Sequence, residues 1–161
     1  TDNMEKYELG IAVSKLYDFI WEEFCDWYIE MVKSRLWNDE DDTKAAALWT
    51  LKTVLINCLK LLHPYMPFVT EEIYGSLTDG DDSYEESIMI SKWPEFKAEY
   101  VFADDEAAVD KIKEAVRSIR NIRSEMNVAP SKKATVYVVS AKKEIRDIFE
   151  VLYLFGAGFA L

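Results

Sequence analysis

The sequence predicts a mainly α-helical protein, an antiparallel helical bundle with a small α+β appendage at its C-terminal end. Three stretches predict the bundle: apolar residues recur at steps of three and four over residues 4–36, an almost continuous apolar tract covers 44–62, and another helical stripe covers 105–126. Half of the 161 residues are apolar, so burial can offset the entropy lost on folding. We expect a helical-bundle domain at 1–128 and a truncated appendage at 129–161.

The first predicted helix has an unusually wide apolar face. A second, aromatic stripe lies beside the first one and shares Phe24 with it. Such a face predicts packing against more than one neighbour. The main stripe comprises Leu9, Val13, Leu16, Ile20, Phe24, Trp27 and Met31, and the aromatic stripe comprises Tyr17, Trp21, Phe24 and Tyr28.

The second predicted helix, 44–62, is apolar on most sides, which is typical of a central helix. Thr43 stands where a capping residue belongs, after an acidic turn at 38–42. Pro67 then suits the first turn of a short helix that ends near Leu77. These helices complete the first part of the bundle.

Residues 78–103 read as irregular, with a short extended segment near 87–96. A fourth helix begins after Asp104 or Asp105, ends near Met126, and has Asn127 as a left-handed stop. Residues 134–140 then predict a strand and 142–155 a helix, and the sheet of this appendage needs at least one further strand. The predicted core face of the fourth helix comprises Val109, Ile112, Val116, Ile119, Ile122 and Met126.

Charge is distributed unevenly along the chain. Residues 1–110 hold 25 acidic and 9 basic side chains, whereas 111–161 hold 5 acidic and 10 basic ones, within a net charge of −11. A polyanion, nucleic acid above all, should therefore meet the C-terminal third. No charged-then-apolar leader opens the chain, and no uninterrupted apolar run approaches the roughly 20 residues of a membrane span, so we expect a soluble, cytoplasmic protein.

Signals of independent catalysis are absent from the sequence. His63 is the single histidine and its place before Pro64 looks structural, while Cys25 and Cys58 have no CxxC spacing and read as buried thiols. The acidic runs 39–42 and 79–82 do not fit a calcium loop, because the positions for the central Gly and the terminal Glu of the second run hold other residues. No phosphate-binding loop, HExxH or GxSxG motif occurs. We expect no catalytic site, no metal and no cofactor in this chain.

The candidate binding residues fall into two groups. On the fourth helix, basic side chains recur at i, i+4 and i+7, where they could hold phosphates; a solvated face paired with Glu114 or Glu125 is the alternative. At the end of the first helix, cations lie next to residues that could contact unpaired bases, although bundle core is the competing interpretation for the aromatic ones. The first group is Lys113, Arg117, Arg120, Arg123, Lys132 and Lys133, and the second is Tyr28, Ile29, Lys33 and Arg35.

Four segments carry a family resemblance: FIWEEFCDWYIEMVK at 19–33, LKLLHPYMPFVTEEIY at 59–74, IMISKWP at 88–94 and IRNIRSEMNVAPSKKATVYV at 119–138. In this order and spacing the chain resembles the C-terminal anticodon-binding region of valyl-tRNA synthetases, over about residues 4–150. The second segment is similar to leucyl and isoleucyl enzymes as well, whereas the fourth resembles the valyl branch. The resemblance implies the helical bundle of the class I synthetases.

The resemblance also implies a partner and a larger enzyme. The partner is a valine-accepting tRNA, and an upstream catalytic domain of the same chain would ligate valine to it with ATP and magnesium. The family's ATP signatures resemble H-I-G-H and K-M-S-K-S; one histidine cannot supply the first, and PSKK at 130–133 does not match the second. The resemblance therefore restricts this chain to tRNA binding.

Two departures from the family pattern qualify this expectation. A leading helix that resembles N-K-x-W-N-x-x-R-F does not occur, and residues after about 150 match poorly. Without that helix an apolar groove lined by the first two helices would be exposed, so we expect self-association. The alternatives are a helical protein–protein interaction module without RNA binding, or the equivalent domain of a leucyl or isoleucyl synthetase.

Overall fold

The computed structural model describes residues 1–129, 132, 135, 137 and 139–154. These residues form helices joined by loops, and no strand occurs among them, which confirms the prediction of a mainly α-helical chain. They divide into two compact units, Thr1–Phe96 and Lys97–Leu161. The domain boundary predicted at 128/129 falls inside the second unit and stays a prediction.

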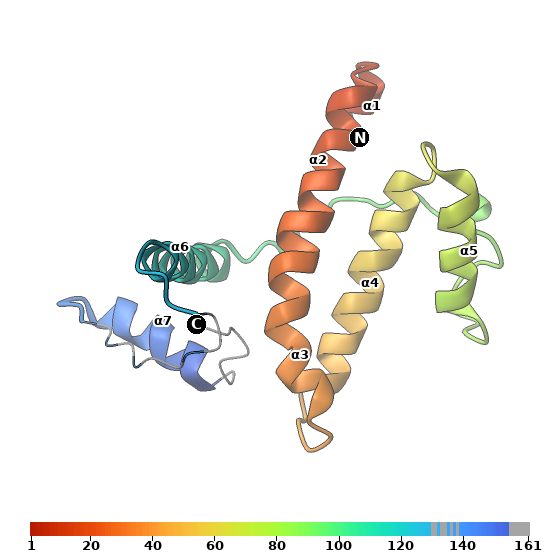
Figure 1. Cartoon of the computed structure of the whole chain (residues 1–161). Helices are drawn as coiled ribbons and strands as arrows, with labels where there is room; N and C mark the ends of the chain where they lie inside the picture. Colours follow the sequence, from red (N-terminus) through yellow and green to blue (C-terminus); the bar gives the residue numbers. More distant parts are fainter. Residues whose placement is uncertain (130–131, 133–134, 136, 138, 155–161) are drawn as a thin grey trace. The chain divides into compact units, whose positions relative to one another are not determined.

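The first predicted helix is wrong in one respect, because it is broken near its start. A short α1 (Asp2–Glu5) precedes Tyr7, whose φ of 59° is left-handed and interrupts the helical path. The chain then runs as one rod through α2 (Leu9–Asp18), η1 (Phe19–Ile29) and α3 (Glu30–Trp37) (Figure 1). The middle segment η1 is a π-helix, in which each turn holds more residues than an α-helical turn.

The central position of α4 is confirmed. This helix spans Lys44–Leu62, as predicted, and contacts α2, α3 and α5 (Pro67–Thr78). In Figure 1, α4 runs back beside the rod, and α5 lies on the side of α4 that faces away from the rod. Ile56 and Leu59 of α4 pack with Tyr74 of α5 and with Ile88 in a core cluster. Burying such side chains stabilises the unit by about 1.5–3 kcal/mol each.

Helix α4 also has the length and composition of a membrane-spanning helix. Core helices of soluble proteins pass the same test, and Ile56, Cys58 and Leu59 are buried within the first unit. Composition alone is therefore weak support for a membrane segment here.

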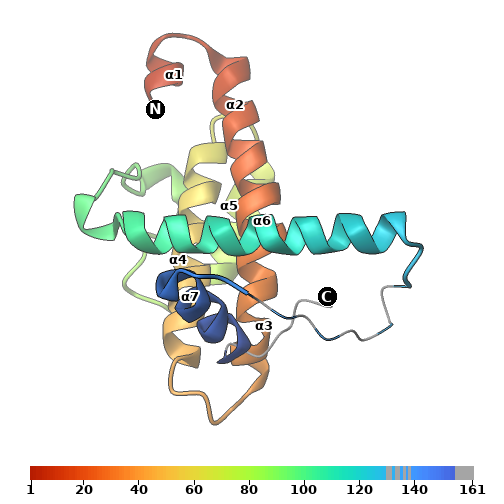
Figure 2. The same ribbon diagram turned by 90° about the vertical axis from the view of Figure 1, so that its left-hand side faces the viewer.

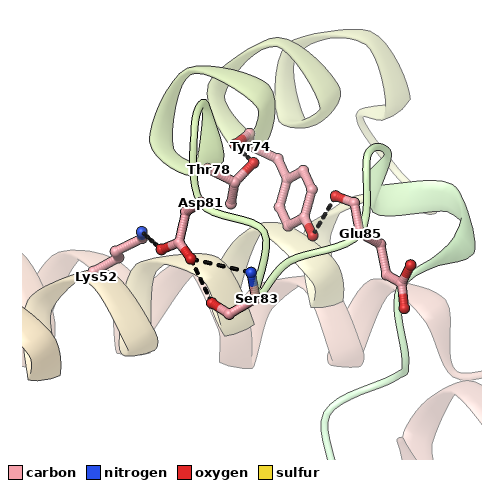
Figure 3. Close-up of polar contacts among 6 residues, drawn as sticks. All are labelled: Lys52, Tyr74, Thr78, Asp81, Ser83 and Glu85. Atoms are coloured by element: carbon pink, nitrogen blue, oxygen red, sulfur yellow. Dashed lines mark hydrogen bonds and ion pairs between the residues drawn. The ribbon is translucent and has the colours of Figure 1, made fainter.

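The loop after α5 is fastened to α4 and α5 by polar contacts (Figure 3). Lys52 Nζ lies 2.7 Å from Asp81 Oδ2, and the Asp81 carboxylate also accepts a hydrogen bond from the backbone N–H of Ser83. The Tyr74 hydroxyl donates to the Glu85 carbonyl, 3.2 Å away. Where the sequence predicts an extended segment, the structure has a short 3₁₀ turn, η2 (Ile88–Ile90), whose N-cap is the Ser87 hydroxyl.

The second unit contains η3 (Ala98–Tyr100), α6 (Ala103–Glu125) and α7 (Lys143–Leu154). Helix α6 runs unbroken in Figure 2 and ends at Glu125. Asn127, two residues later, has the predicted left-handed conformation, with φ 52°. The predicted strand at 134–140 falls largely outside the described residues, since 134, 136 and 138 are among those not described. The helix predicted after it corresponds to α7.

The predicted core face of α6 is buried only in its middle. Ile112 and Val116 are buried, whereas Ile122 and Met126 are exposed. The regular apolar spacing continues beyond the part of the helix that other residues cover. The prediction of a core position was therefore wrong for Ile122 and Met126.

Candidate nucleic-acid interface

Helix α6 carries opposite charges at its two ends. Asp104, Asp105 and Glu106 occupy its first turn, while Arg123 is in its last turn. Each sign complements the helix dipole, whose N-terminal end is positive and C-terminal end negative. The C-terminal half of α6 also carries three of the basic residues that the sequence predicts for binding, Arg117, Arg120 and Arg123.

Arg117 and Arg120 are exposed on this half of α6, three residues apart and hence on one side of the helix. Lys113, the third member of the predicted stripe, is instead buried, with 8% of its surface exposed. Its Nζ lies 3.6 Å from Asp110 Oδ1. The structure therefore presents two of the three predicted cations to solvent.

Arg123 is half-buried and its guanidinium contacts the chain that follows α6. Its Nη2 donates to the carbonyl oxygens of Ala129, at 3.0 Å, and Lys132, at 2.7 Å. The Lys132 side chain is exposed, and Lys133 lies outside the described residues. Arg117, Arg120 and Lys132 thus remain the exposed predicted cations that the structure describes in this unit.

The candidates of the first unit are engaged in local contacts. Lys33 pairs with Glu30 one helical turn earlier. Arg35 donates from Nε to Thr43 Oγ1 and from Nη2 to the Thr43 carbonyl, both at 2.8 Å. Arg35 therefore ties the end of α3 to the start of α4.

Thr43 is the N-cap residue of α4, as predicted, but its hydroxyl makes no capping hydrogen bond to the helix. The hydroxyl and the backbone N–H of Thr43 both donate to Asp41 Oδ1, and these hydrogen bonds hold the pKa of Asp41 below its usual value. Arg35, Thr43 and Asp41 form one network across the acidic turn. This network links the end of α3, the acidic turn and the start of α4.

Tyr28 and Ile29, at the end of η1, are half-buried. The Tyr28 ring stacks on buried Phe24, with centroids 6.3 Å apart and planes 15° from parallel. Bundle core is confirmed for Phe24 and Trp27, which are both buried. A base-contacting role for Tyr28 and Ile29 stays a prediction.

Helix α7 adds cations that were not among the predicted site residues. Lys111 of α6 lies 3.2 Å from Glu144 of α7, and the side chain of neighbouring Lys143 is largely exposed. Arg146 donates to the Ser140 carbonyl. The excess of basic residues after residue 110 was the signal for them, since it extends past α6.

Catalytic and metal-binding arrangements are not evident among the described residues. No group of three or more His, Cys, Asp or Glu side chains there could hold a metal ion. His63 lies against Thr70, with Nδ1 2.8 Å from its Oγ1, and against Met89. Burial raises the pKa of the Cys58 thiol to about 11, which disfavours the reactive thiolate.

Comparison with known proteins places this helical, cation-bearing chain in a class. A family model described as the anticodon-binding domain of tRNA ligase matches residues 1–138. The chain belongs to this family of anticodon-binding domains.

Among the relatives most similar to the chain are valine–tRNA ligases. The chain is 50% identical to the valine–tRNA ligase of Clostridium perfringens over 149 residues, which are 92% of the chain and 16% of that ligase. It is 48% identical to the valine–tRNA ligase of Clostridium acetobutylicum over 151 residues, and 41% identical to that of a Streptococcus agalactiae strain over 150 residues. The chain therefore spans about one sixth of the length of these relatives.

Proposed function

We propose that this chain binds the anticodon stem-loop of a valine-accepting tRNA. Membership of the anticodon-binding family is the single observation that carries the proposal, and the valine assignment rests on the valine–tRNA ligases at 41–50% identity. Exposed Arg117, Arg120 and Lys132 supply cations for the phosphates of a closely spaced RNA backbone.

The larger protein supplies the chemistry. A catalytic domain upstream in the same chain ligates valine to the tRNA with ATP and magnesium, while this part holds the anticodon arm. The relatives extend far beyond the matched segment, which leaves room for such a domain. The proposed location of this enzyme is the cytoplasm.

The alternative function is a protein-interaction module, which the acidic first unit and its exposed apolar residues would suit. The family assignment favours RNA. A leucine- or isoleucine-accepting tRNA is the alternative substrate, and the valine–tRNA ligase relatives favour a valine-accepting tRNA.

A fluorescence titration tests the proposal. The chain is titrated at low salt with a transcript of a valine-accepting tRNA and with the same transcript carrying an altered anticodon, and both titrations are repeated at higher salt. We expect tighter binding of the unaltered transcript and weaker binding of both as salt rises. Equal, salt-sensitive binding would leave only a phosphate-binding role, and no binding at low salt would favour the interaction module.

A further inference from the structure

The guanidinium of Arg123 joins both ends of the turn that follows α6. Its Nη2 donates to the carbonyl oxygens of Ala129 and Lys132, at 3.0 and 2.7 Å. The backbone N–H of Lys132 donates to the same Ala129 carbonyl, at 3.0 Å. One side chain therefore fixes the backbone at residue 132 relative to the last turn of the helix.

The end of α6 supplies a second anchor for this turn. Asn127 is left-handed, its N–H donates to the Ser124 carbonyl at 3.1 Å, and the N–H of Val128 donates to the Arg123 carbonyl at 2.8 Å. These two hydrogen bonds form a Schellman motif, which satisfies carbonyls at the helix end and turns the chain. Arg123 takes part with its backbone and its side chain.

We propose that Arg123 is a positioning residue of the RNA-binding face, which acts through Lys132. The inference rests on the proposed function. Arg123 uses Nη2 to hold the backbone of Lys132, and the exposed Lys132 ammonium then meets a phosphate beside those bound by Arg117 and Arg120. A residue whose backbone is already ordered before binding loses less conformational entropy when the complex forms.

Arginine suits this role better than lysine does. The two N–H groups of Nη2 are fixed in the guanidinium plane and so point at the two carbonyl oxygens in a set geometry. The three N–H groups of a lysine ammonium rotate freely at the end of a flexible stem. Both residues carry the positive charge that favours a helix C-terminus. The substitution Arg123→Lys therefore keeps the charge and removes the planar guanidinium.

The test compares charge with geometry in the 161-residue chain. R123K, R123A and K132A are titrated with the valine tRNA transcript over a range of salt. The matched control is R146K, at an exposed arginine of α7 that is not among the proposed binding residues and that also donates to a backbone carbonyl. We expect R123K to weaken binding several-fold, nearly as much as R123A. The plot of log affinity against log salt should become less steep by about 0.7–0.9, which corresponds to the loss of one phosphate contact. R146K should bind nearly as the unaltered chain does.

A double variant tests the route through Lys132. If Arg123 acts through that residue, R123K adds no further loss in a K132A background, because coupled residues are not additive. Full additivity of the two losses would overturn the inference. Binding by R123K equal to that of the unaltered chain, with a loss in R123A, would also overturn it, because Arg123 would then act as a charge.

A readout without RNA separates this inference from the proposed function. Amide hydrogen exchange by NMR should become faster at Lys132 in R123K and R123A, while exchange in α4 stays unchanged. An unchanged exchange rate at Lys132 would overturn the proposed positioning of Lys132 by Arg123, even if the chain binds tRNA. Failure of the unaltered chain to bind tRNA would overturn the proposed function and this RNA role together, whatever the exchange shows.

Discussion

Asp81 fastens the loop after α5 through one carboxylate. It accepts hydrogen bonds from Lys52 and from Ser83, and these, with the Lys52 hydrogen bond largest, lower its pKa from 3.8 to about 2. The Lys52 ammonium also lies 4.6 Å from the centroid of the Tyr84 ring. Ionised Asp81 therefore stabilises the folded loop.

We predict that Asp81→Asn lowers the free energy of unfolding at neutral pH. Because the folded pKa lies below the unfolded one, the stabilisation is present above about pH 3.8 and is lost as the pH falls through about 2. Urea unfolding of both proteins between pH 6 and pH 2 measures the difference, which should shrink toward zero at the acid end. Asp82→Asn, the same change at the adjacent exposed carboxylate, is the control. A difference that stays constant with pH would contradict the assignment.

The burial and the hydrogen bonds of several predicted site residues could not be predicted from the sequence. The helical spacing correctly puts Lys113 near Arg117 on α6, but it cannot say that Lys113 is buried beside Asp110. Likewise, nothing in the sequence indicates that Arg35 bonds Thr43 or that Arg123 bonds Ala129. Both contacts depend on loop conformations, which apolar periodicity does not determine.

At the scale of the element, α5 contains a glycine that its helix does not need. Gly75 lies inside the helix, and a Cβ added there would meet no side chain or other part of the fold within 4 Å. We predict that Gly75→Ala stabilises the protein by about 0.5–1 kcal/mol, because alanine loses less backbone entropy on folding. Thermal unfolding followed by circular dichroism should show a higher Tm.

Gly80 provides the opposite control in the loop next to α5. A Cβ added there would also have open space around it, but the φ of Gly80 is +72°. Gly80→Ala should therefore destabilise the protein by about 1–2 kcal/mol, the cost of a left-handed conformation for a residue with a side chain. Equal effects of the two substitutions would contradict the backbone argument.

The exposed arginines of α6 should contribute to RNA affinity without contributing to specificity. Arg117→Ala with Arg120→Ala should weaken binding about equally for any tRNA, since phosphate contacts carry little sequence information, and should reduce the salt slope by about 1.4–1.8. Titrations with valine-accepting and unrelated transcripts measure this. Lys6→Ala with Lys92→Ala removes the same charge from exposed sites of the first unit and should have a much smaller effect. A loss confined to one anticodon would refute phosphate binding.

The elements themselves were largely predictable. The bounds of α4 and the start of α5 follow from the apolar tract and from Pro67, because both signals are local. The break at Tyr7 and the π-helical η1 were not predictable, since the aromatic stripe of residues 17–28 is equally consistent with an α-helix. The exposure of Ile122 and Met126 depends on which residues cover α6, and periodicity contains no such information.

At the scale of the whole molecule, charge separates between the two units. Thr1–Phe96 holds 20 acidic and 8 basic residues, whereas Lys97–Leu161 holds 10 acidic and 11 basic ones. A polyanion is therefore repelled by the first unit and tolerated by the second. Binding of RNA should consequently depend on residues of the second unit.

Self-association is the remaining prediction for the whole chain. Phe68 is 90% exposed, and Met89 and Ile90 are also largely exposed, so the first unit presents large apolar side chains that a second copy could cover. We expect the sedimentation coefficient to rise with protein concentration, and Phe68→Ser to reduce the rise. A single monomeric species at all concentrations would contradict this prediction.

The opposite charges at the ends of α6 have a kinetic consequence. The helix has 23 residues and is about 35 Å long, so its acidic first turn and basic last turns are well separated compared with a screening length of about 8 Å in physiological salt. An approaching RNA is then repelled at one end of the helix and attracted at the other, before any contact forms. The association rate constant, more than the dissociation rate constant, should therefore carry the influence of Asp104, Asp105 and Glu106.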